Sequence, residues 1–377
     1  MVYLDQAATS PVRREVLGAM WPFLTGDFGN PSSQHEFGFR AAEALTSARV
    51  GISGQLGCKP AEVIFTSGGT EADNLAIKGI ALATPRGRHL IVSAVEHEAV
   101  LESADYLARH HGFEVSILPV DDAGLVSPEV LKNQLRPDTT LVSIIYANNE
   151  IGTVQPIAEL AAIARSAGVP FHTDAVQAAG SLDISLTALG VDALSISGHK
   201  LGAPKGIGAL AIRSRIPLEP LLNGGGQERG HRSGTENVAG AVGLATALSI
   251  ERADATTIAA LRDRLIDGVL DAVPVARLTG HPSSRLPGHA SFVFPRTSGE
   301  SLLLELEQRG IIVSSGSACA AGNDEPSAVL LAIGISPEVA QTAVRFTFGA
   351  DTTADEIEST IRAVGEAVAA IRALAPR

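Results

Sequence analysis

Residues 193–200 have the sequence Ala193-Leu194-Ser195-Ile196-Ser197-Gly198-His199-Lys200, a short strand-like run followed by a polar turn that ends in a lysine. Similar strand-like runs recur through the middle of the chain, and helix-like stretches separate many of them. The strand-like runs are residues 62–66, 89–93, 114–118, 140–145, 169–173, 193–197 and 208–212, and the helix-like stretches include 71–82, 99–110, 128–135 and 157–167. This alternation predicts an α/β fold with a mostly parallel sheet that helices cover on both faces.

The chain beyond about residue 235 predicts a second unit. Residues 235–273 are rich in Ala and Leu with helical periodicity, which indicates a connecting helix or a pair of helices. Beyond them, strand-like runs at 289–294, 311–314 and 344–348 lie among helix-like stretches at 300–309, near 329 and from 353 onward. We expect a large domain at residues 15–258 and a smaller α+β domain made of residues 1–14 and 259–377.

Composition places the chain among globular enzymes. It has 377 residues, 45% of them hydrophobic and 19% charged, and a net charge of −12, which argues against a nucleic-acid-binding surface. The first residues lack a basic and then apolar pattern, so we expect no secretory signal, and no apolar run reaches the roughly 18 residues of a membrane helix. The two cysteines, Cys58 and Cys319, lie far apart in dissimilar contexts, so we expect no disulfide and a cytoplasmic location.

Lys200 and Asp174 carry the first indication of chemistry. A lysine can hold an aldehyde cofactor as a Schiff base, and an aspartate at a strand end can keep the cofactor's ring nitrogen protonated. Pyridoxal-phosphate enzymes require this pair. Two alternatives stay open, because Asp174 could cap the next helix and Lys205 could be the reactive lysine. Lys200 is favoured, because it lies in an apolar, Gly-rich stretch that gives it little reason to be on the surface. Ser197 and His199, just before it, could donate to a phosphate.

Three further strand ends carry residues that suit such a cofactor. Residues 66–71, Thr-Ser-Gly-Gly-Thr-Glu, join a strand to a helix and could bind the phosphate, although an ordinary capped helix start is the alternative. Gln177, one helical turn after Asp174, could hydrogen-bond the phenolic oxygen. His97 could stack on a flat ring or move protons, and Asn149 follows a strand in the same manner; either could instead be a turn or cap.

Cys319 and Arg345 point to the substrate. Cys319 lies in the small, polar run of residues 314–323, where a thiolate could approach a bound substrate, whereas Cys58 reads as an incidental residue at a helix end. A tolerated surface thiol is the alternative for Cys319. Arg345 is a cation within a strand pattern and suits a bidentate grip on an amino acid carboxylate; an internal salt bridge is its alternative.

Together these motifs resemble the cysteine desulfurase family, in its NifS/IscS-like branch, within the class-V aminotransferase group of pyridoxal-phosphate enzymes. The resemblance runs nearly end to end. It includes residues 3–9, 29–33, 66–74, 96–97, 148–152, 174–177, 197–200, 224–229, 232–235, 314–319 and 345–346. The Ser-Ser-Gly-Ser-Ala-Cys form of residues 314–319 is similar to the branch whose cysteine loop is long and mobile.

The resemblance implies a fold, a cofactor and roles for particular residues. The implied fold is the type I fold of pyridoxal-phosphate-dependent transferases, with a seven-stranded, mostly parallel sheet. In the implied site, Lys200 forms the Schiff base, Asp174 pairs the pyridine nitrogen, His97 stacks on the ring, Gln177 contacts the phenolic oxygen, Gly69, Thr70, Ser197 and His199 hold the phosphate, and Asn149 and Arg345 bind the substrate carboxylate. Thr235 is expected to reach the cofactor phosphate of a neighbouring subunit, which implies a homodimer.

The implied reaction removes sulfur from L-cysteine, leaving L-alanine and a persulfide on Cys319. The sulfur then passes to an acceptor such as an iron–sulfur scaffold or a tRNA-thiolating protein, with no membrane or direct nucleic-acid partner. No metal site is expected beyond transient iron–sulfur ligation by Cys319. Rivals with the same cofactor are a selenocysteine lyase and a class-V aminotransferase. A non-catalytic sulfur-carrier scaffold would need neither Lys200 nor Asp174.

Overall fold

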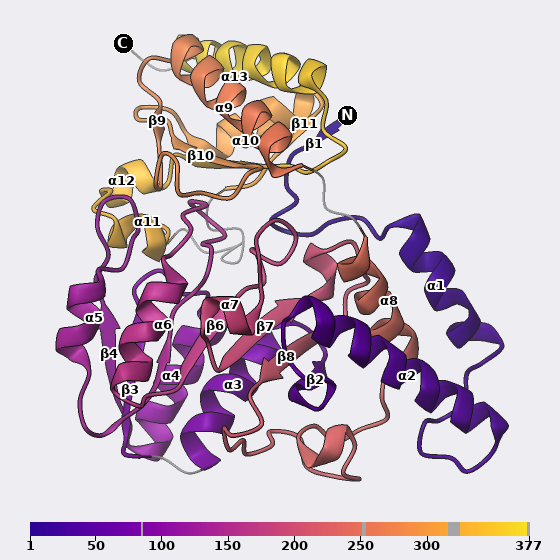
Figure 1. Ribbon diagram of the computed structural model, residues 1–377. Helices are drawn as coiled ribbons and strands as arrows, with labels where there is room; N and C mark the ends of the chain where they lie inside the picture. Colours follow the sequence, from indigo (N-terminus) through magenta and orange to yellow (C-terminus); the bar gives the residue numbers. More distant parts are fainter. Residues whose placement is uncertain (84–85, 251–253, 316–324, 375–377) are drawn as a thin grey trace.

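The computed structural model describes residues 1–83, 86–250, 254–315 and 325–374, and a seven-stranded sheet lies at its centre (Figure 1). The strands, in sheet order, are β2 (Val63–Thr66), β8 (Gly208–Ile212), β7 (Ala193–Ser197), β6 (Phe171–Asp174), β5 (Thr139–Ser143), β3 (His89–Ser93) and β4 (Glu114–Leu118). Only β8 among them runs antiparallel to its neighbours, β2 and β7. The predicted α/β fold with a mostly parallel sheet is therefore confirmed.

Both faces of this sheet are buried, because alternate side chains of the strands enter two different hydrophobic clusters. Leu194 and Ala211 point into one cluster, while Leu90 and Leu210 point into the other. The first face is covered by helices that include α2 (Glu36–Gln55), α6 (Ile157–Ser166), α7 (Leu186–Leu189) and α8 (Val238–Ser249), and the second by α3 (Gly69–Ala83) and α4 (Glu98–His111). Strands buried on both sides read as continuous apolar runs, which explains the sequence pattern.

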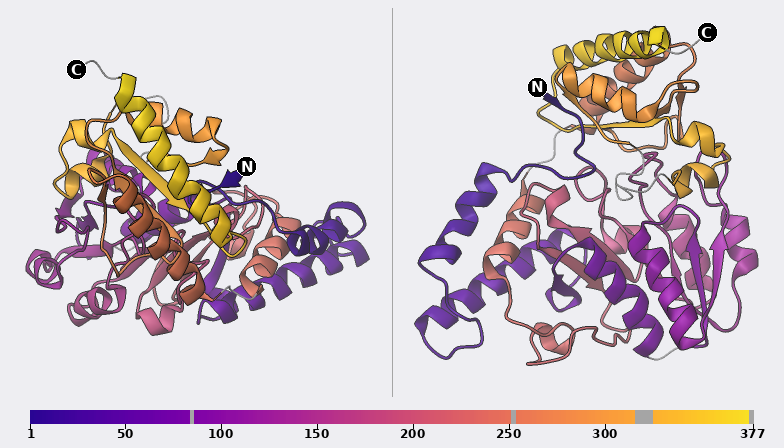
Figure 2. Two further views of the ribbon diagram at one scale, coloured as in Figure 1. Left: turned by 90° about the horizontal axis from the view of Figure 1, so that it is seen from above. Right: turned by 180° about the vertical axis from the view of Figure 1, so that it is seen from behind.

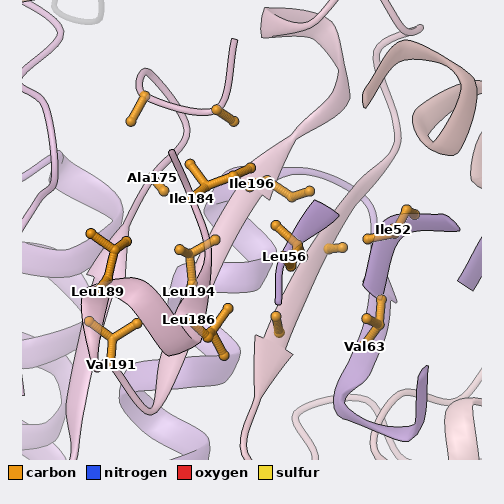
Figure 3. Packing of buried hydrophobic residues seen from close by; sticks show 14 of the residues in the cluster. Ile52, Leu56, Val63, Ala175, Ile184, Leu186, Leu189, Val191, Leu194 and Ile196 are labelled. Carbon is orange, nitrogen blue, oxygen red and sulfur yellow. The ribbon is translucent and has the colours of Figure 1, made fainter. Parts of the chain in front are cut away.

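The core is packed directly behind the strand ends that carry the predicted site. Figure 3 shows Leu194 and Ile196 of β7 beside Leu186, Leu189 and Ala175, all of them buried. Ala175 immediately follows Asp174, so the ends of β6 and β7 rest on close-packed side chains. Such packing limits how far Asp174 and the turn after Ser197 can move.

A smaller unit lies above the large sheet (Figure 1) and contains the three-stranded sheet β12-β10-β9. Its elements are β1 (Val2–Tyr3), α9 (Ala255–Ala272), β9 (Arg277–Leu278), β10 (His289–Val293), α10 (Gly299–Gln308), β11 (Ile311–Ile312), α11 (Ala328–Ala332), α12 (Pro337–Ala340), β12 (Ala343–Thr347) and α13 (Ala354–Leu374). β1 pairs in parallel with β11, and Figure 2 shows α13 lying across the outer side of the unit. The first residues of the chain therefore pack with its last third.

The hydrophobic clusters support the expected domain division, which we keep as a proposal. Leu4 packs in one cluster with residues such as Leu265 and Phe346, whereas α1 (Arg14–Thr25) packs with the large sheet's cluster through Val16. The remaining described helices are α5 (Pro128–Gln134) and the short 3-10 turns η1 (Pro60–Glu62), η2 (Gly198–Lys200) and η3 (Glu228–Gly230). Among the described residues, no helix is both long and apolar enough to span a bilayer.

Candidate active site

The predicted cofactor residues meet at one edge of the large sheet. Strands β2, β3, β5, β6 and β7 all run in the same direction, so their carboxyl ends share that edge. His97 follows β3, Asp174 ends β6, and Lys200 follows β7. Ligands of open α/β sheets bind at such an edge.

Lys200 and Gln177 converge on one backbone carbonyl. The Nζ of Lys200 donates to the carbonyl oxygens of Ala7 and Ala8, the latter at 2.7 Å. The Nε2 of Gln177 donates to the same Ala7 oxygen at 3.0 Å. The N-terminal segment thus lies over the strand ends, and the two side chains reach the same point from β7 and from the turn after β6.

Asp174 is a buried carboxyl group with a defined electrostatic setting. It accepts a hydrogen bond from the Val176 N–H at 2.8 Å. Burial raises its pKa above the usual value, while His97, the Val176 N–H and Lys200 act in the opposite direction. A buried carboxylate needs a cationic or hydrogen-bonding partner, and a protonated ring nitrogen is such a partner.

His97 is held by the start of α4. It is the N-cap of that helix, and its Nδ1 accepts a hydrogen bond from the Ala99 N–H at 3.1 Å. In the neutral ring the proton therefore lies on Nε2. The helix cap that the sequence left open as an alternative is present, and it orients the imidazole beside Asp174.

The start of α3 forms a close-fitting cradle. A Cβ atom at Gly69 would lie 2.7 Å from Cγ2 of Val176 and 3.5 Å from Cβ of Ser197, so only glycine fits there without a shift. The buried Ser197 ends β7, and Thr70 is exposed at the first turn of the helix. First-turn N–H groups lack intrahelical acceptors, so this helix start suits a phosphate group.

His199 ties the Lys200 turn to the N-terminal segment. Its Nδ1 lies 3.2 Å from Oγ1 of Thr9, and its carbonyl accepts from the Ser10 N–H at 2.9 Å and hydroxyl at 2.8 Å. Burial, with the charges of Lys200 and Lys205 acting in the same direction, lowers the pKa of His199 to about 4. The ring is neutral at physiological pH and can donate a single N–H.

A buried polar network below Asp174 was not predicted from the sequence. His172 on β6 lies 2.8 Å from the Ser143 hydroxyl and 3.0 Å from the Ser195 hydroxyl, and 3.7 Å from Oδ1 of Asp73. Burial lowers the pKa of His172 to about 3 and raises that of Asp73 well above its usual range, with Asp174 adding to the latter effect. Asp73 lies one turn into α3. From the sequence alone it resembles an ordinary polar residue on a helix.

Glu96 extends this network next to the predicted His97. Its Oε1 accepts from the Ser93 hydroxyl at 2.5 Å and the Ile145 N–H at 2.7 Å, which connects the ends of β3 and β5. Burial raises the pKa of Glu96 to about 8. The carboxyl group is therefore largely protonated at neutral pH, and its hydrogen bonds hold the segments after β3 and β5 together.

Arg345 lies within β12 and is 2% exposed. Its Nη1 donates to the Asn149 carbonyl at 2.9 Å, and its Nη2 pairs with Oδ1 of Asp5 at 2.9 Å. The internal salt bridge left open by the sequence is thus present. The Nε of Arg345 is buried without an acceptor among the described residues, which leaves an N–H for an anionic ligand.

Cys319 lies outside the described residues, but both flanks of its segment are placed. The backbone of Ser314 pairs with that of Arg345 through bonds of 3.3 and 2.8 Å, and the Ser327 hydroxyl donates to Oε2 of Glu150 at 2.5 Å. Burial raises the pKa of Glu150 to about 7. The segment that carries Cys319 therefore begins and ends beside the predicted carboxylate site.

Cys58 and Thr235 lie away from the sheet edge that carries Lys200 and Asp174. Cys58 follows α2 and packs partly against the core, and burial raises its pKa to about 11, so it is a poor nucleophile at neutral pH. Thr235 is exposed, between η3 and α8. The structure thus brings Lys200, Asp174 and their neighbours together at the sheet edge, while the predicted role of Thr235 requires a second subunit.

Comparisons with known proteins agree with this geometry. The chain matches the family model described as Aminotransferase class-V over residues 2–359. It is 47% identical over 380 residues to cysteine desulfurase IscS of Methanosarcina thermophila, covering 100% of this chain and 94% of that protein. A solved structure described as a NifS-like protein matches with a TM-score of 0.90 at 37% identity, covering 98% of this chain and 99% of the other. Another, described as SspA in complex with cysteine, matches with a TM-score of 0.83 at 36% identity, covering 93% and 99%. The chain therefore belongs to the aminotransferase class-V family, among its cysteine desulfurases.

Proposed function

We propose that this protein removes the sulfur of L-cysteine, releases L-alanine, and holds the sulfur as a persulfide on Cys319. The observation that carries the proposal is the placement of Arg345. Its buried guanidinium keeps an N–H for which the described part of the chain offers no acceptor, and its backbone anchors Ser314 just before the Cys319 segment. A group that binds a carboxylate is therefore joined directly to the segment that carries the nucleophile.

The enzyme uses pyridoxal 5'-phosphate, and the described residues fit this cofactor. Lys200 provides the amine, Asp174 a buried carboxyl group for the ring nitrogen, and Gln177 an amide for the phenolic oxygen. The phosphate suits the α3 start at Gly69 and Thr70, with Ser197 and His199 beside it. When bound, pyridoxal phosphate withdraws electrons from the bonds at the substrate's α-carbon. We assign His97 to the face of the ring.

Asn149 and Arg345 orient the substrate in this proposal. The guanidinium of Arg345 donates to the Asn149 carbonyl and pairs with Asp5, and its remaining N–H groups donate to the carboxylate of cysteine. The desolvated position of Arg345 strengthens this interaction relative to a surface pair. Lys200 Nζ would take and return the proton of the substrate's α-carbon.

The thiolate of Cys319 completes the reaction. Its Sγ attacks the substrate sulfur, a sulfur–sulfur bond forms, and the bond between the substrate's Cβ and sulfur breaks. The electron pair of that bond stays on carbon, which takes up a proton and gives alanine. Cys58 is an unsuitable alternative, because its raised pKa keeps the thiol protonated.

We also propose a homodimer in which Thr235 reaches the partner's cofactor phosphate. Helices α1 and α2 expose large apolar side chains, among them Leu17, Trp21, Leu24 and Phe39, and Trp21 is 64% exposed. Helix α8, which begins shortly after Thr235, packs on both α1 and α2. An apolar face of this kind beside Thr235 fits a second copy of the chain.

The persulfide's acceptor is proposed from chemistry alone. We expect the recipient to be a cytoplasmic protein with a free thiol, such as an iron–sulfur scaffold protein. The reason is that a persulfide is transferred by attack of a second thiolate. A selenocysteine lyase would use the same cofactor residues.

The variant Cys319→Ala separates the proposed reaction from an aminotransferase. We expect it to keep the yellow cofactor absorbance and to lose sulfide release from L-cysteine in the presence of a reductant. Cys58→Ala is the matched control and should keep wild-type sulfide release. An aminotransferase has no use for a nucleophilic cysteine, so undiminished sulfide production by Cys319→Ala would contradict the proposal.

A further inference from the structure

The small sheet turns a polar face toward the turn that carries Asn149. On β10, His289 and Ser291 alternate with Ala290 and Phe292, which enter the small hydrophobic core. Ser291 is the register partner of Arg345 on the antiparallel neighbour β12. His289 and Arg345 therefore project from the same face of adjacent strands.

Both side chains bind the same backbone atom. The carbonyl oxygen of Asn149 accepts from Nη1 of Arg345 at 2.9 Å and lies 3.2 Å from Nε2 of His289. Within the turn, Asn148 Oδ1 accepts from the N–H groups of Glu150 at 2.8 Å and Ile151 at 2.9 Å. The turn is thus fixed by Asn148 from inside and by His289 and Arg345 from outside.

His289 is a neutral donor in this arrangement. Its Nε2 faces a carbonyl oxygen, so Nε2 carries the proton. Burial lowers the pKa of His289 well below its usual value, and the charges of Arg285 and Arg345 act in the same direction. A Cβ atom at Gly152, whose φ is +78°, would lie 2.5 Å from Nδ1 of the ring, so the turn packs tightly against the imidazole.

We propose that His289 is a positioning residue for substrate recognition, which holds the Asn149 carbonyl so that Asn149 and Arg345 stay aligned for the substrate carboxylate. This inference rests on the proposed function of those two residues. Without the His289 donor, Arg345 would be the single side chain that holds the Asn149 carbonyl. The chemical groups of Lys200 and Cys319 would be unchanged.

The test compares His289→Ala with His289→Gln in the pyridoxal-phosphate-loaded enzyme. We expect His289→Ala to raise the KM for L-cysteine by roughly 3- to 10-fold, the effect of one neutral hydrogen bond, with kcat changed by no more than about twofold. His289→Gln keeps an N–H donor at similar reach and should restore the KM. His89→Ala is the control, because His89 is also a buried first residue of a strand but binds Thr139 and Ser116. It should leave the KM unchanged.

Two outcomes would overturn the inference: a wild-type KM in His289→Ala, or a KM in His289→Gln raised as far as in the alanine variant. If His289→Ala does not fold, His289→Asn, whose amide is too short to reach, takes its place in the same comparison. Arg345→Lys tests the underlying carboxylate site separately. An unchanged KM in Arg345→Lys would defeat that site whatever the His289 variants show.

Discussion

The buried ion pair between Arg49 and Glu228 is expected to make a large contribution to the free energy of unfolding. Both guanidinium Nη atoms bind the carboxylate, at 2.8 and 2.7 Å, and the side chains are 12% and 2% exposed. Glu228 also accepts from the Phe65 N–H at 3.1 Å, and Arg49 donates to the Val63 carbonyl at 2.6 Å. The pair therefore joins α2, β2 and η3.

The variant Glu228→Gln keeps the shape of the side chain and removes its charge. It leaves the Arg49 cation buried with no full counter-charge, which costs about 3–5 kcal/mol. Taken over the proposed large domain of roughly 240 residues, at about 2.1 cal/mol/K of unfolding entropy per residue, this predicts a Tm lower by about 6–10 °C. Glu228 and Arg229 have positive φ values of 49° and 59°, a strained backbone conformation that the ion pair with Arg49 helps to hold.

Differential scanning calorimetry of the holoenzyme measures this Tm directly. Glu358→Gln is the matched control, because its 2.6 Å pair with Arg264 is exposed, and we expect no measurable change there. A Tm shift in Glu228→Gln no larger than that of the control would show that the buried pair does not stabilise the fold by this amount. It would mean that water or another group neutralises Arg49.

Three further predictions concern pH, the cofactor and assembly. Burial raises the pKa of Glu150 to about 7 in the folded state, so its ionisation lowers the free energy of unfolding as pH rises from about 4.5 to 7. The variant Glu150→Gln should remove up to about 3 kcal/mol of this decline, measured by urea unfolding at pH 5 and pH 8. Parallel pH profiles for the variant and the wild type would contradict this. Borohydride reduction followed by peptide mapping should place a pyridoxyl group on Lys200 and none on Lys205, and an adduct on Lys205 alone would make the assignment of Lys200 wrong. Trp21→Glu should convert the dimer to a monomer in sedimentation experiments, whereas Leu304→Glu, an exposed residue on α10, should not; a monomeric wild-type protein would contradict the proposed interface.

The central sheet and the residues at its edge could be predicted because buried parallel strands have a simple sequence pattern. Each strand is a short apolar run, and the polar residues that follow it, such as Asp174 and Lys200, lie where the strands end. Helices α1 and α2 were not predicted. Their apolar residues occupy both faces, as Trp21 and Phe39 are exposed, and the buried stripe of α2 is largely Gly, Ala and Ser.

The partners within the site were harder to predict than the residues themselves. Arg345 pairs with Asp5, 340 residues away, and no local pattern indicates a contact at that separation. Asp73 and His172 form a buried network whose members lie on different elements, and each alone resembles an ordinary polar residue. His289 is a further case, since its role depends on a carbonyl of a turn in the other unit.

Persulfide formation on Cys319 is the step that makes this protein a cysteine desulfurase, and it can be measured directly. The holoenzyme is mixed with L-cysteine without a reductant, the free thiols are alkylated, and the peptide that contains Cys319 is analysed by mass spectrometry. We expect this peptide to gain the mass of one sulfur atom, alanine to appear in equal amount, and the Cys58 peptide to stay unchanged. Alanine release with no added sulfur on Cys319 would show that Cys319 is not the residue that takes the sulfur.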